Sequence, residues 1–280
     1  MQQREEYPAG VPCWVDTGRK DAEAAMAFYG GLFGWEFENV SPDGAPRYFT
    51  ATLRGLTVGA IGEQPEMDWA PVWNTYVRVE DADAAVEKVT GAGGKVTMQP
   101  LAAGPAGRLA AFDDTEGASL CIWEPAETRG AQLVNEPGTW VFSGLNTGDS
   151  WAAQSFYGSV FGWEIGPADD DGSAMIMKPG YVDFLAQRDP EIYARLEQFG
   201  APAGFGDVVA TTAPLSNGTP AHWDITFGVE DADASVARAK ELGAEVVVEP
   251  FDAPWVRAAV LRDTDGITFT VSQFVPPEAS

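Results

Sequence analysis

Cysteine is scarce in this chain of 280 residues, which holds only Cys13 and Cys121. A secreted scaffold held together by disulfides would carry more, so we expect both thiols to stay reduced. Catalytic signatures are lacking as well. No Ser-His-Asp order and no G-x-S-x-G elbow occurs, and the glycine-rich "GAGG" at 91–94 lacks the lysine and hydroxyl of a phosphate loop. These gaps argue against a serine hydrolase and against a nucleotide-binding protein.

Basic residues are few too, with 17 Lys and Arg against 42 Asp and Glu and a formal net charge of −25. Such a surface repels nucleic acids and anionic lipids, whereas it attracts cationic ligands. No apolar run approaches the ~18 residues of a membrane span. The start "MQQREEYPAG" lacks the apolar core of a signal peptide. We therefore predict a cytoplasmic protein that binds neither nucleic acid nor membrane.

What the chain does contain is an internal repeat. "AMAFYGGLFGWEF" at 25–37 returns as "AQSFYGSVFGWEI" at 153–165, and "VEDADA" at 79–84 returns at 229–234. "DTEG" at 114–117 matches "DTDG" at 263–266. Repeats of this length predict two equivalent modules. We place module 1 at 8–125, a polar linker at 126–137 and module 2 at 138–276.

Each module divides further into two half-modules with the order βαβββ. In the first, "VPCWVDTGR" is typical of a strand, "DAEAAMAFYGGLF" has helical spacing that ends at Gly34, and three strands follow. The second repeats this order from "NTYVRV" and the helix "DADAAVEKVTGAG". The mixed order predicts an α+β fold. The repeated aromatics Phe28, Tyr29, Phe33 and Trp35 are expected to pack the helix onto its sheet.

The spacing between the repeats grows in module 2, which predicts an insertion there. We place it at 188–221, and it contains "DPEIYARLEQFG" with helical spacing of Ile192, Leu196 and Phe199. Long loops of this kind are often functional. A lid over a pocket and a plain surface excursion are both compatible with the sequence.

These motifs resemble the vicinal oxygen chelate superfamily, which includes glyoxalase I, bleomycin-resistance proteins and extradiol dioxygenases. The "YxxGVPCWVD" opening and the two-module length are similar to tandem glyoxalase-like proteins of actinobacteria. The resemblance implies that βαβββ units pair into curled mixed sheets forming cups. In the family's enzymes each cup holds a divalent metal through His, Glu or Gln.

The positions that correspond to the family's metal ligands carry unsuitable side chains. They are Trp14, Asn74 and Cys121 in module 1 and Phe142, Asp224 and Thr270 in module 2; a fourth position falls near Ala60 and Leu185. Only Asp224, helped by His222 two residues away, could ligate a metal, and two ligands are too few for such a site. We therefore predict no metal and no other cofactor.

Side chains that alternate with these positions should line the cups. As ligand-binding candidates we name Trp14, Asn74, Tyr76, Cys121, Trp123, Trp140, Phe142, Thr226, Thr270 and Ser272. This mixture of aromatic and small polar groups suits a small-molecule pocket, although the aromatics could equally fill the cups themselves. His222, Asp224 and Asp16 are the candidates for proton transfer, because burial or a neighbouring charge would shift their pKa values.

Three functions stay open on this reading. The first is metal-independent binding of a hydrophobic, aromatic small molecule, as in bleomycin-resistance proteins. The second is a metal-free enzyme of secondary metabolism, hydroxylase-like or lyase-like, using Asp16 or His222 and Asp224. The third is a metal-dependent lyase or dioxygenase. The sequence leaves open whether the protein is a monomer or a homodimer.

Overall fold

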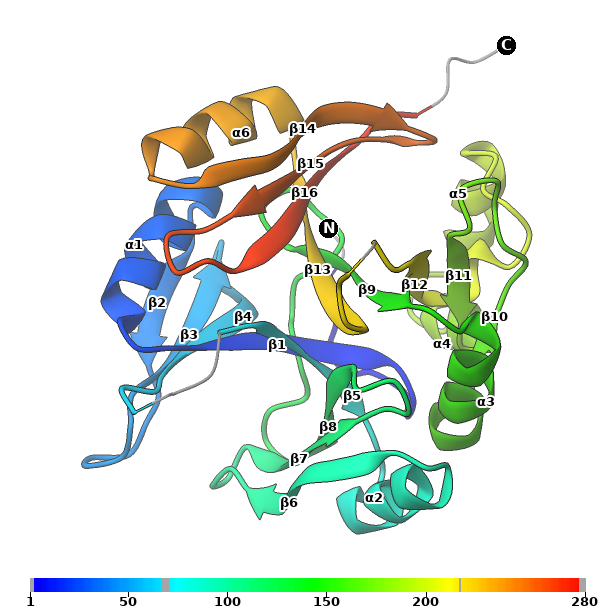
Figure 1. Cartoon of the computed structure of the whole chain (residues 1–280), viewed down its shortest axis with the longest axis horizontal. Helices are drawn as coiled ribbons and strands as arrows, with labels where there is room; N and C mark the ends of the chain where they lie inside the picture. The colour runs from blue at the N-terminus through cyan, green and yellow to red at the C-terminus, as the bar shows by residue number, and fades with distance from the viewer. Residues whose placement is uncertain (1–2, 67–70, 217, 277–280) are drawn as a thin grey trace.

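Two eight-stranded sheets form the protein in a computed structural model that describes residues 3–66, 71–216 and 218–276 (Figure 1). Module 1 comprises β1 (Pro12–Arg19), α1 (Ala22–Phe33), β2 (Glu36–Asn39), β3 (Tyr48–Leu53), β4 (Leu56–Glu63), β5 (Trp73–Arg78), α2 (Ala82–Gly91), β6 (Lys95–Ala102), β7 (Gly107–Asp113) and β8 (Ser119–Pro125). Module 2 comprises β9 (Trp140–Thr147), α3 (Ser150–Phe161), β10 (Glu164–Ile165), β11 (Ala174–Met177), α4 (Tyr181–Ala186), α5 (Ile192–Gln198), the 3-10 helix η1 (Phe205–Asp207), β12 (Val208–Pro214), β13 (His222–Val229), α6 (Ala232–Glu241), β14 (Glu245–Ala253), β15 (Val256–Arg262) and β16 (Thr268–Phe274).

Each sheet belongs to one module. The orders β2-β3-β4-β1-β5-β8-β7-β6 and β10-β11-β12-β9-β13-β16-β15-β14 are equivalent. The first strand of each half-module pairs in parallel with the last strand of the same half, and β1–β5 and β9–β13 join the halves antiparallel. The predicted α+β fold of four βαβββ units is confirmed, and the two halves of one module share a sheet.

The helices repeat as closely as the strands do. An aspartate caps the N-terminus of α1, α2, α3 and α6 by accepting a hydrogen bond from a backbone amide three residues on. Gly34 and Gly162 end α1 and α3 in the left-handed conformation, with φ of 74° and 70°, which glycine adopts without the steric cost of a Cβ.

Each sheet has two different faces. We call the face that carries Trp14, Asp16, Asn74 and Tyr76 the inner face of module 1, and the face that carries Phe142, Asp224, Thr226, Thr270 and Ser272 the inner face of module 2. The opposite, outer faces meet between the modules, where the Thr75 and Ser143 hydroxyls lie 2.6 Å apart and are buried. The two inner faces therefore point away from the boundary between the modules.

The repeated aromatic phrase lies at this boundary. Helix α1 packs beside α6, and α3 packs beside α2, so each helix of the repeat contacts the other module (Figure 1). The Trp35 indole donates to the Gly138 carbonyl (2.7 Å) and the Trp163 indole donates to the Gly10 carbonyl (2.6 Å). We expected these aromatics in the core, and they are buried; in addition they join the two modules.

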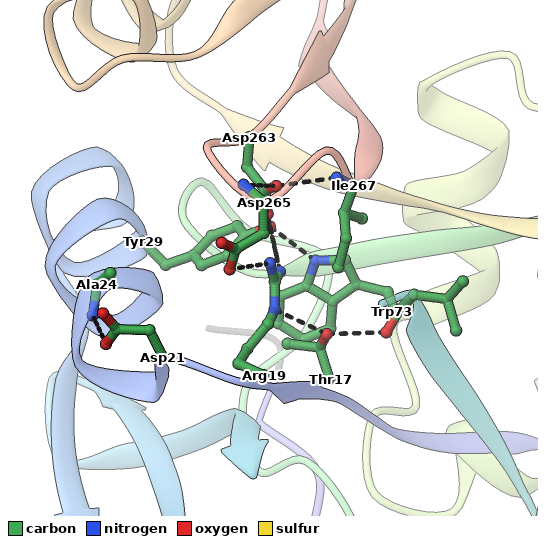
Figure 2. A network of polar contacts seen from close by, with 10 residues as sticks. Thr17, Arg19, Asp21, Ala24, Tyr29, Trp73, Asp263, Asp265 and Ile267 are labelled. Atoms are coloured by element: carbon green, nitrogen blue, oxygen red, sulfur yellow. Dashed lines mark hydrogen bonds and ion pairs between the residues drawn. The ribbon is translucent and has the colours of Figure 1, made fainter. Parts of the chain in front are cut away.

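A buried polar network completes one side of the boundary (Figure 2). Arg19 of β1 forms an ion pair with Asp263 of the "DTDG" loop (2.8 Å), and both side chains are at most 2% exposed. The Tyr29 hydroxyl also donates to Asp263 (2.8 Å), and the Trp73 indole donates to Tyr29 (2.9 Å). Two of the repeated motifs therefore contact each other across the boundary: the tyrosine of "FY" in module 1 binds the aspartate of "DTDG" in module 2.

The other side of the boundary uses the same plan with one change. Tyr157 donates to Asp114 (2.8 Å) and Trp223 donates to Tyr157 (3.0 Å), as in the first network. The position of Arg19 is taken by Thr147, whose hydroxyl bonds Glu116. The repeat thus preserves the tyrosine–aspartate contact and varies the residue beside it.

The extra segment of module 2 replaces a tight turn. In module 1, β3 and β4 are joined by Arg54 and Gly55, both at positive φ. In module 2, residues 178–207 join the equivalent strands β11 and β12 and contain α4, α5 and η1. The predicted insertion at 188–221 thus began too late and included β12, because 208–214 belongs to the sheet.

None of the helices in the described part of the chain is long and apolar enough to span a bilayer.

Candidate functional site

The inner face of module 1 is organised around one carboxylate. Asp16 accepts hydrogen bonds from the Tyr48 hydroxyl (2.8 Å), the Tyr76 hydroxyl (3.0 Å) and the Asn74 amide (2.9 Å). The Trp14 indole donates to Tyr48 (3.0 Å) and so extends the cluster. Burial raises the pKa of Asp16, and the three donors oppose this shift only in part. This face therefore presents a shielded carboxylate held by neutral donors.

The remaining module 1 candidates close in around this cluster. Tyr76 and Trp123 meet edge to face with ring centres 6.5 Å apart, and the Trp123 indole donates to the Thr128 carbonyl (2.8 Å). Cys121 is adjacent to Tyr76 on the paired strand, and burial raises the pKa of its thiol. A thiol of this kind is a poor nucleophile at neutral pH.

Replacing Asp16 by asparagine should change how stability depends on pH. Because burial raises its pKa, the folded protein holds this proton more tightly than the unfolded chain does. The contribution of Asp16 to wild-type stability should therefore fall as pH rises from about 4, the unfolded value, through the raised folded value. D16N removes this fall, so the difference in unfolding free energy, variant minus wild type, should increase with pH. Denaturant titrations between pH 4 and 9 measure it, and a flat difference, as expected for the exposed control D43N, would contradict it.

The inner face of module 2 has a corresponding pair with the strands exchanged. Here the carboxylate is Asp224 on the first strand of the second half-module, and the amide of Asn146 on β9 donates to it (2.8 Å). Asp224 pairs in register with Gly144, whose missing side chain leaves room for the carboxylate. Burial raises the pKa of Asp224, while Asn146 and the nearby His222 lower it. The carboxylate–amide pair is thus the chemical feature common to both faces.

His222 does not form the predicted pair with Asp224. It lies exposed at the start of β13, and its Nδ1 is 2.9 Å from the Pro220 carbonyl. A carbonyl oxygen only accepts, so Nδ1 carries the proton and Nε2 is the free acceptor. The effect of His222 on the pKa of Asp224 is electrostatic: the positive charge that the histidine carries when protonated lowers it.

The hydroxyl candidates do line this face. Thr226 pairs in register with Thr270, and both are half-buried, as are Phe142 and Ser272. Their neighbours on the strands, including Phe227 and Val271, are fully buried on the outer face. Period-two alternation therefore placed these residues correctly, although their role in binding stays a prediction.

Trp140 lies on the opposite face from the one we predicted. A bulge in β9 sets Trp140 and Phe142 against the consecutive residues Phe227 and Thr226 of β13, which breaks the alternation. The Trp140 indole consequently donates to Ser143 (3.2 Å), at the boundary between the modules. Trp140 is a residue of the module interface.

Two residues of these faces were not among the predicted site residues. Tyr48 of β3 binds Asp16, and Thr211 of β12 lies beside Gly144 and Asp224. Thr211 takes the position that counting had assigned near Leu185, because the longer insertion displaces the numbering and puts Leu185 in α4. Alternation along "RYFTATL" could have indicated Tyr48, but nothing in the sequence fixes which face it shares.

These residues do not fit the metal centre that the resemblance implies. Among the described residues, no three His, Cys, Asp or Glu side chains gather in a way that could hold a metal ion. The carboxylates on the two inner faces are bonded instead to amides and, in module 1, to tyrosines. Such donor-rich surroundings satisfy a carboxylate without a cation.

Comparisons with known proteins agree with this fold. Residues 14–122 match the glyoxalase/bleomycin resistance protein/dioxygenase superfamily, and residues 141–272 match a glyoxalase-like domain. The chain therefore belongs to the glyoxalase/bleomycin resistance protein/dioxygenase superfamily, as a tandem of two such modules.

Two curated relatives match the chain along nearly its whole length. CFP32 of Mycobacterium tuberculosis, named as a candidate glyoxylase, is 37% identical over 283 residues, which cover 99% of this chain and 100% of the relative. The anthracycline biosynthesis protein DauV of Streptomyces sp. strain C5 is 33% identical over 279 residues, covering 95% of this chain and 94% of DauV.

Solved structures share the fold at much lower identity. The Mn(II)-bound glyoxalase of Novosphingobium aromaticivorans has a TM-score of 0.59 at 16% identity, over 95% of this chain and 82% of that one. The 2,3-dioxygenase LapB of Pseudomonas sp. KL28 has a TM-score of 0.58 at 12% identity, over 97% and 96%. At these identities the likeness concerns architecture only.

Proposed function

We propose that this protein binds a hydrophobic, aromatic small molecule on the inner face of module 2 without a metal ion. The observation that carries this proposal is the hydrogen-bonded pair of Asp224 and Asn146, of which Asp224 holds the position that the family resemblance assigns to a metal ligand. Phe142, Thr226 and Thr270 lie on the same face and add one aromatic ring and two hydroxyls. This is the composition of a small-molecule site, apolar with a few orienting polar groups.

Module 2 is favoured over module 1 because its inner face is more accessible. Trp14, Asp16, Tyr76, Cys121 and Trp123 are each at most 8% exposed, whereas the module 2 residues Phe142, Asp224, Thr226, Thr270 and Ser272 are half-buried. In module 1 the aromatic side chains fill the space over Asp16 themselves. We therefore assign the ligand to module 2 and a mainly structural role to the polar cluster of module 1.

Isothermal titration with a panel of planar polycyclic compounds, neutral and cationic, tests this proposal. Asp224→Ala should weaken binding about tenfold, equivalent to about 1.4 kcal/mol. The surface variant D43N should bind like the wild type. Metal analysis of the purified protein belongs to the same experiment, since a stoichiometric divalent ion would favour the metal-dependent alternative. An absence of saturable binding across the panel would count against any ligand of this class.

A metal-free enzyme of secondary metabolism is the second candidate. It is supported by the relative DauV, which is named for anthracycline biosynthesis, and by the raised pKa values of Asp16 and Asp224. A carboxyl group with a raised pKa can transfer protons nearer neutral pH. Turnover that survives chelators and is lost in Asp224→Ala would favour this function over binding alone. The cytoplasmic location and a monomeric or homodimeric state remain predictions.

A further inference from the structure

Residues 178–207, which we call the flap, are attached firmly at one end. The backbone amide of Lys178 donates to the Asp207 carbonyl (2.8 Å), which closes the base of the segment. The Lys178 ammonium donates to the Phe161 carbonyl (2.9 Å), and the Asp207 carboxylate accepts from the Val182 amide (2.8 Å). These contacts fix the base of the flap to module 2 beside α3.

The body of the flap is only lightly attached to the rest of the protein. Tyr181, the first residue of α4, packs against the core, but α4, α5 and η1 contain no fully buried residue and pack mainly on one another. An ion pair from Arg188 to Glu6 (2.8 Å) is partly exposed and contributes little. Segments with few buried apolar contacts open at low free-energy cost. The flap therefore belongs to the least stable part of the molecule.

The far end of the flap contacts an aromatic pair in the other half-module of module 2. Phe199, just after α5, contacts Phe274 of β16 edge to face, with ring centres 6.1 Å apart. Trp255, in the β14–β15 turn, lies nearly parallel to Phe274 with ring centres 6.4 Å apart. Phe199 and Phe274 are 50% and 55% exposed. We call these three residues the latch.

The latch lies at one end of the inner face of module 2. Phe274 follows Thr270 and Ser272 in steps of two along β16, so its side chain is on the same face. It is about 7 Å beyond Ser272, from a rise of ~3.3 Å per residue. The flap enters the sheet through β12 and contacts β16 at its tip, so it reaches from one half-module to the other across this end.

The backbone at Trp255 supports a specific role for the latch. Trp255 adopts φ of 70°, a left-handed conformation that is sterically unfavourable for a bulky residue. The Val275 amide donates to its carbonyl (2.7 Å) and holds this turn against the end of β16. A glycine would form this turn without strain. The advantage of tryptophan at this position is its ring, which stacks on Phe274.

We propose that the flap is a gate, held by the aromatic latch, that controls access to the inner face of module 2. The latch buries only part of three rings, so it can release at moderate cost while the base stays fixed. Gly180 and Gly204, at φ of 84° and 81°, flank the segment that must move, which carries α4, α5 and Phe199. The gate serves the ligand site of the proposed function, but its existence is tested without any ligand.

A cysteine placed behind the gate provides the measurement. Ser272→Cys is nearly isosteric, and its labelling rate by a small maleimide reports access to the inner face. In this background Phe199→Ala should raise the rate about three- to tenfold. The matched control Glu197→Ala changes an exposed residue on the same helix and should leave the rate unchanged. Cys13 and Cys121 are buried, and the parent protein without S272C gives their contribution.

Hydrogen exchange of the unliganded protein provides the second readout. Phe199→Ala should speed exchange in 190–204 and leave the strands of module 1 unchanged. Equal labelling and equal exchange in F199A and E197A would overturn the gate. Faster exchange with an unchanged labelling rate would also overturn it, since the latch would then hold a segment that covers nothing. If the gate responds as expected but no ligand binds the wild type, only the proposed function fails.

Discussion

Replacing Arg19 by methionine should lower the free energy of unfolding by about 3–5 kcal/mol, the usual cost of removing one partner from a buried ion pair. The variant leaves the Asp263 carboxylate buried at the module boundary, where the Tyr29 hydroxyl and two backbone amides still donate to it. Its charge would no longer be compensated. Because Arg19 belongs to module 1 and Asp263 to module 2, the loss should weaken the attachment of the modules to each other.

Chemical denaturation followed by tryptophan fluorescence measures this effect. The control Arg262→Met removes a surface pair with Glu245, which is worth at most about 1 kcal/mol. Combining R19M with Asp263→Asn should recover part of the loss, because the second change removes the unpaired charge. A loss below about 1 kcal/mol in R19M would show that the boundary does not depend on this ion pair.

Most of the fold could be predicted from the sequence because the βαβββ pattern occurs four times along the chain. Aspartate caps, the glycine after the first helix of each module and alternating strands recur in the same order, and each repeat supports the others. The partner of the repeated aromatics could not be predicted. Tyr29 and Trp35 have the spacing of a helix packed on its own sheet, and only the tertiary arrangement brings Asp263 and Gly138 of the other module to them.

The candidate site was harder to predict than the fold, for local reasons. Alternation placed Asp16, Thr226, Thr270 and Ser272 on the inner faces, because these strands are regular where those residues lie. It failed at Trp140, because one extra residue in β9 turns every side chain beyond it to the other face. Bulges leave no clear mark in a single sequence. The insertion likewise moved the true neighbour of Gly144 from the expected region of Leu185 to Thr211.

Gly144→Ala should disable the inner face of module 2 while leaving its charges unchanged. A Cβ at this position would lie 2.5 Å from Asp224 Oδ1, closer than real Cβ contacts, and 3.2 Å from Thr211 Oγ1, which is a tight contact. The carboxylate must therefore shift, which disturbs the hydrogen bond that its Oδ2 accepts from the Asn146 amide. We expect a stability loss of about 1–3 kcal/mol from overpacking. Under the proposed function, affinity for the planar ligand should fall at least about tenfold.

A double-mutant cycle separates displacement of Asp224 from general damage to the sheet. If the alanine acts by moving the carboxylate, adding G144A to Asp224→Ala should cost little further affinity, because the group to be moved is already gone. The control Gly91→Ala, at the end of α2 with open space around its Cβ position, should bind like the wild type. Fully additive losses in the cycle would mean that Gly144 acts independently of Asp224, and the carboxylate–amide pair would then lose its place at the centre of the site.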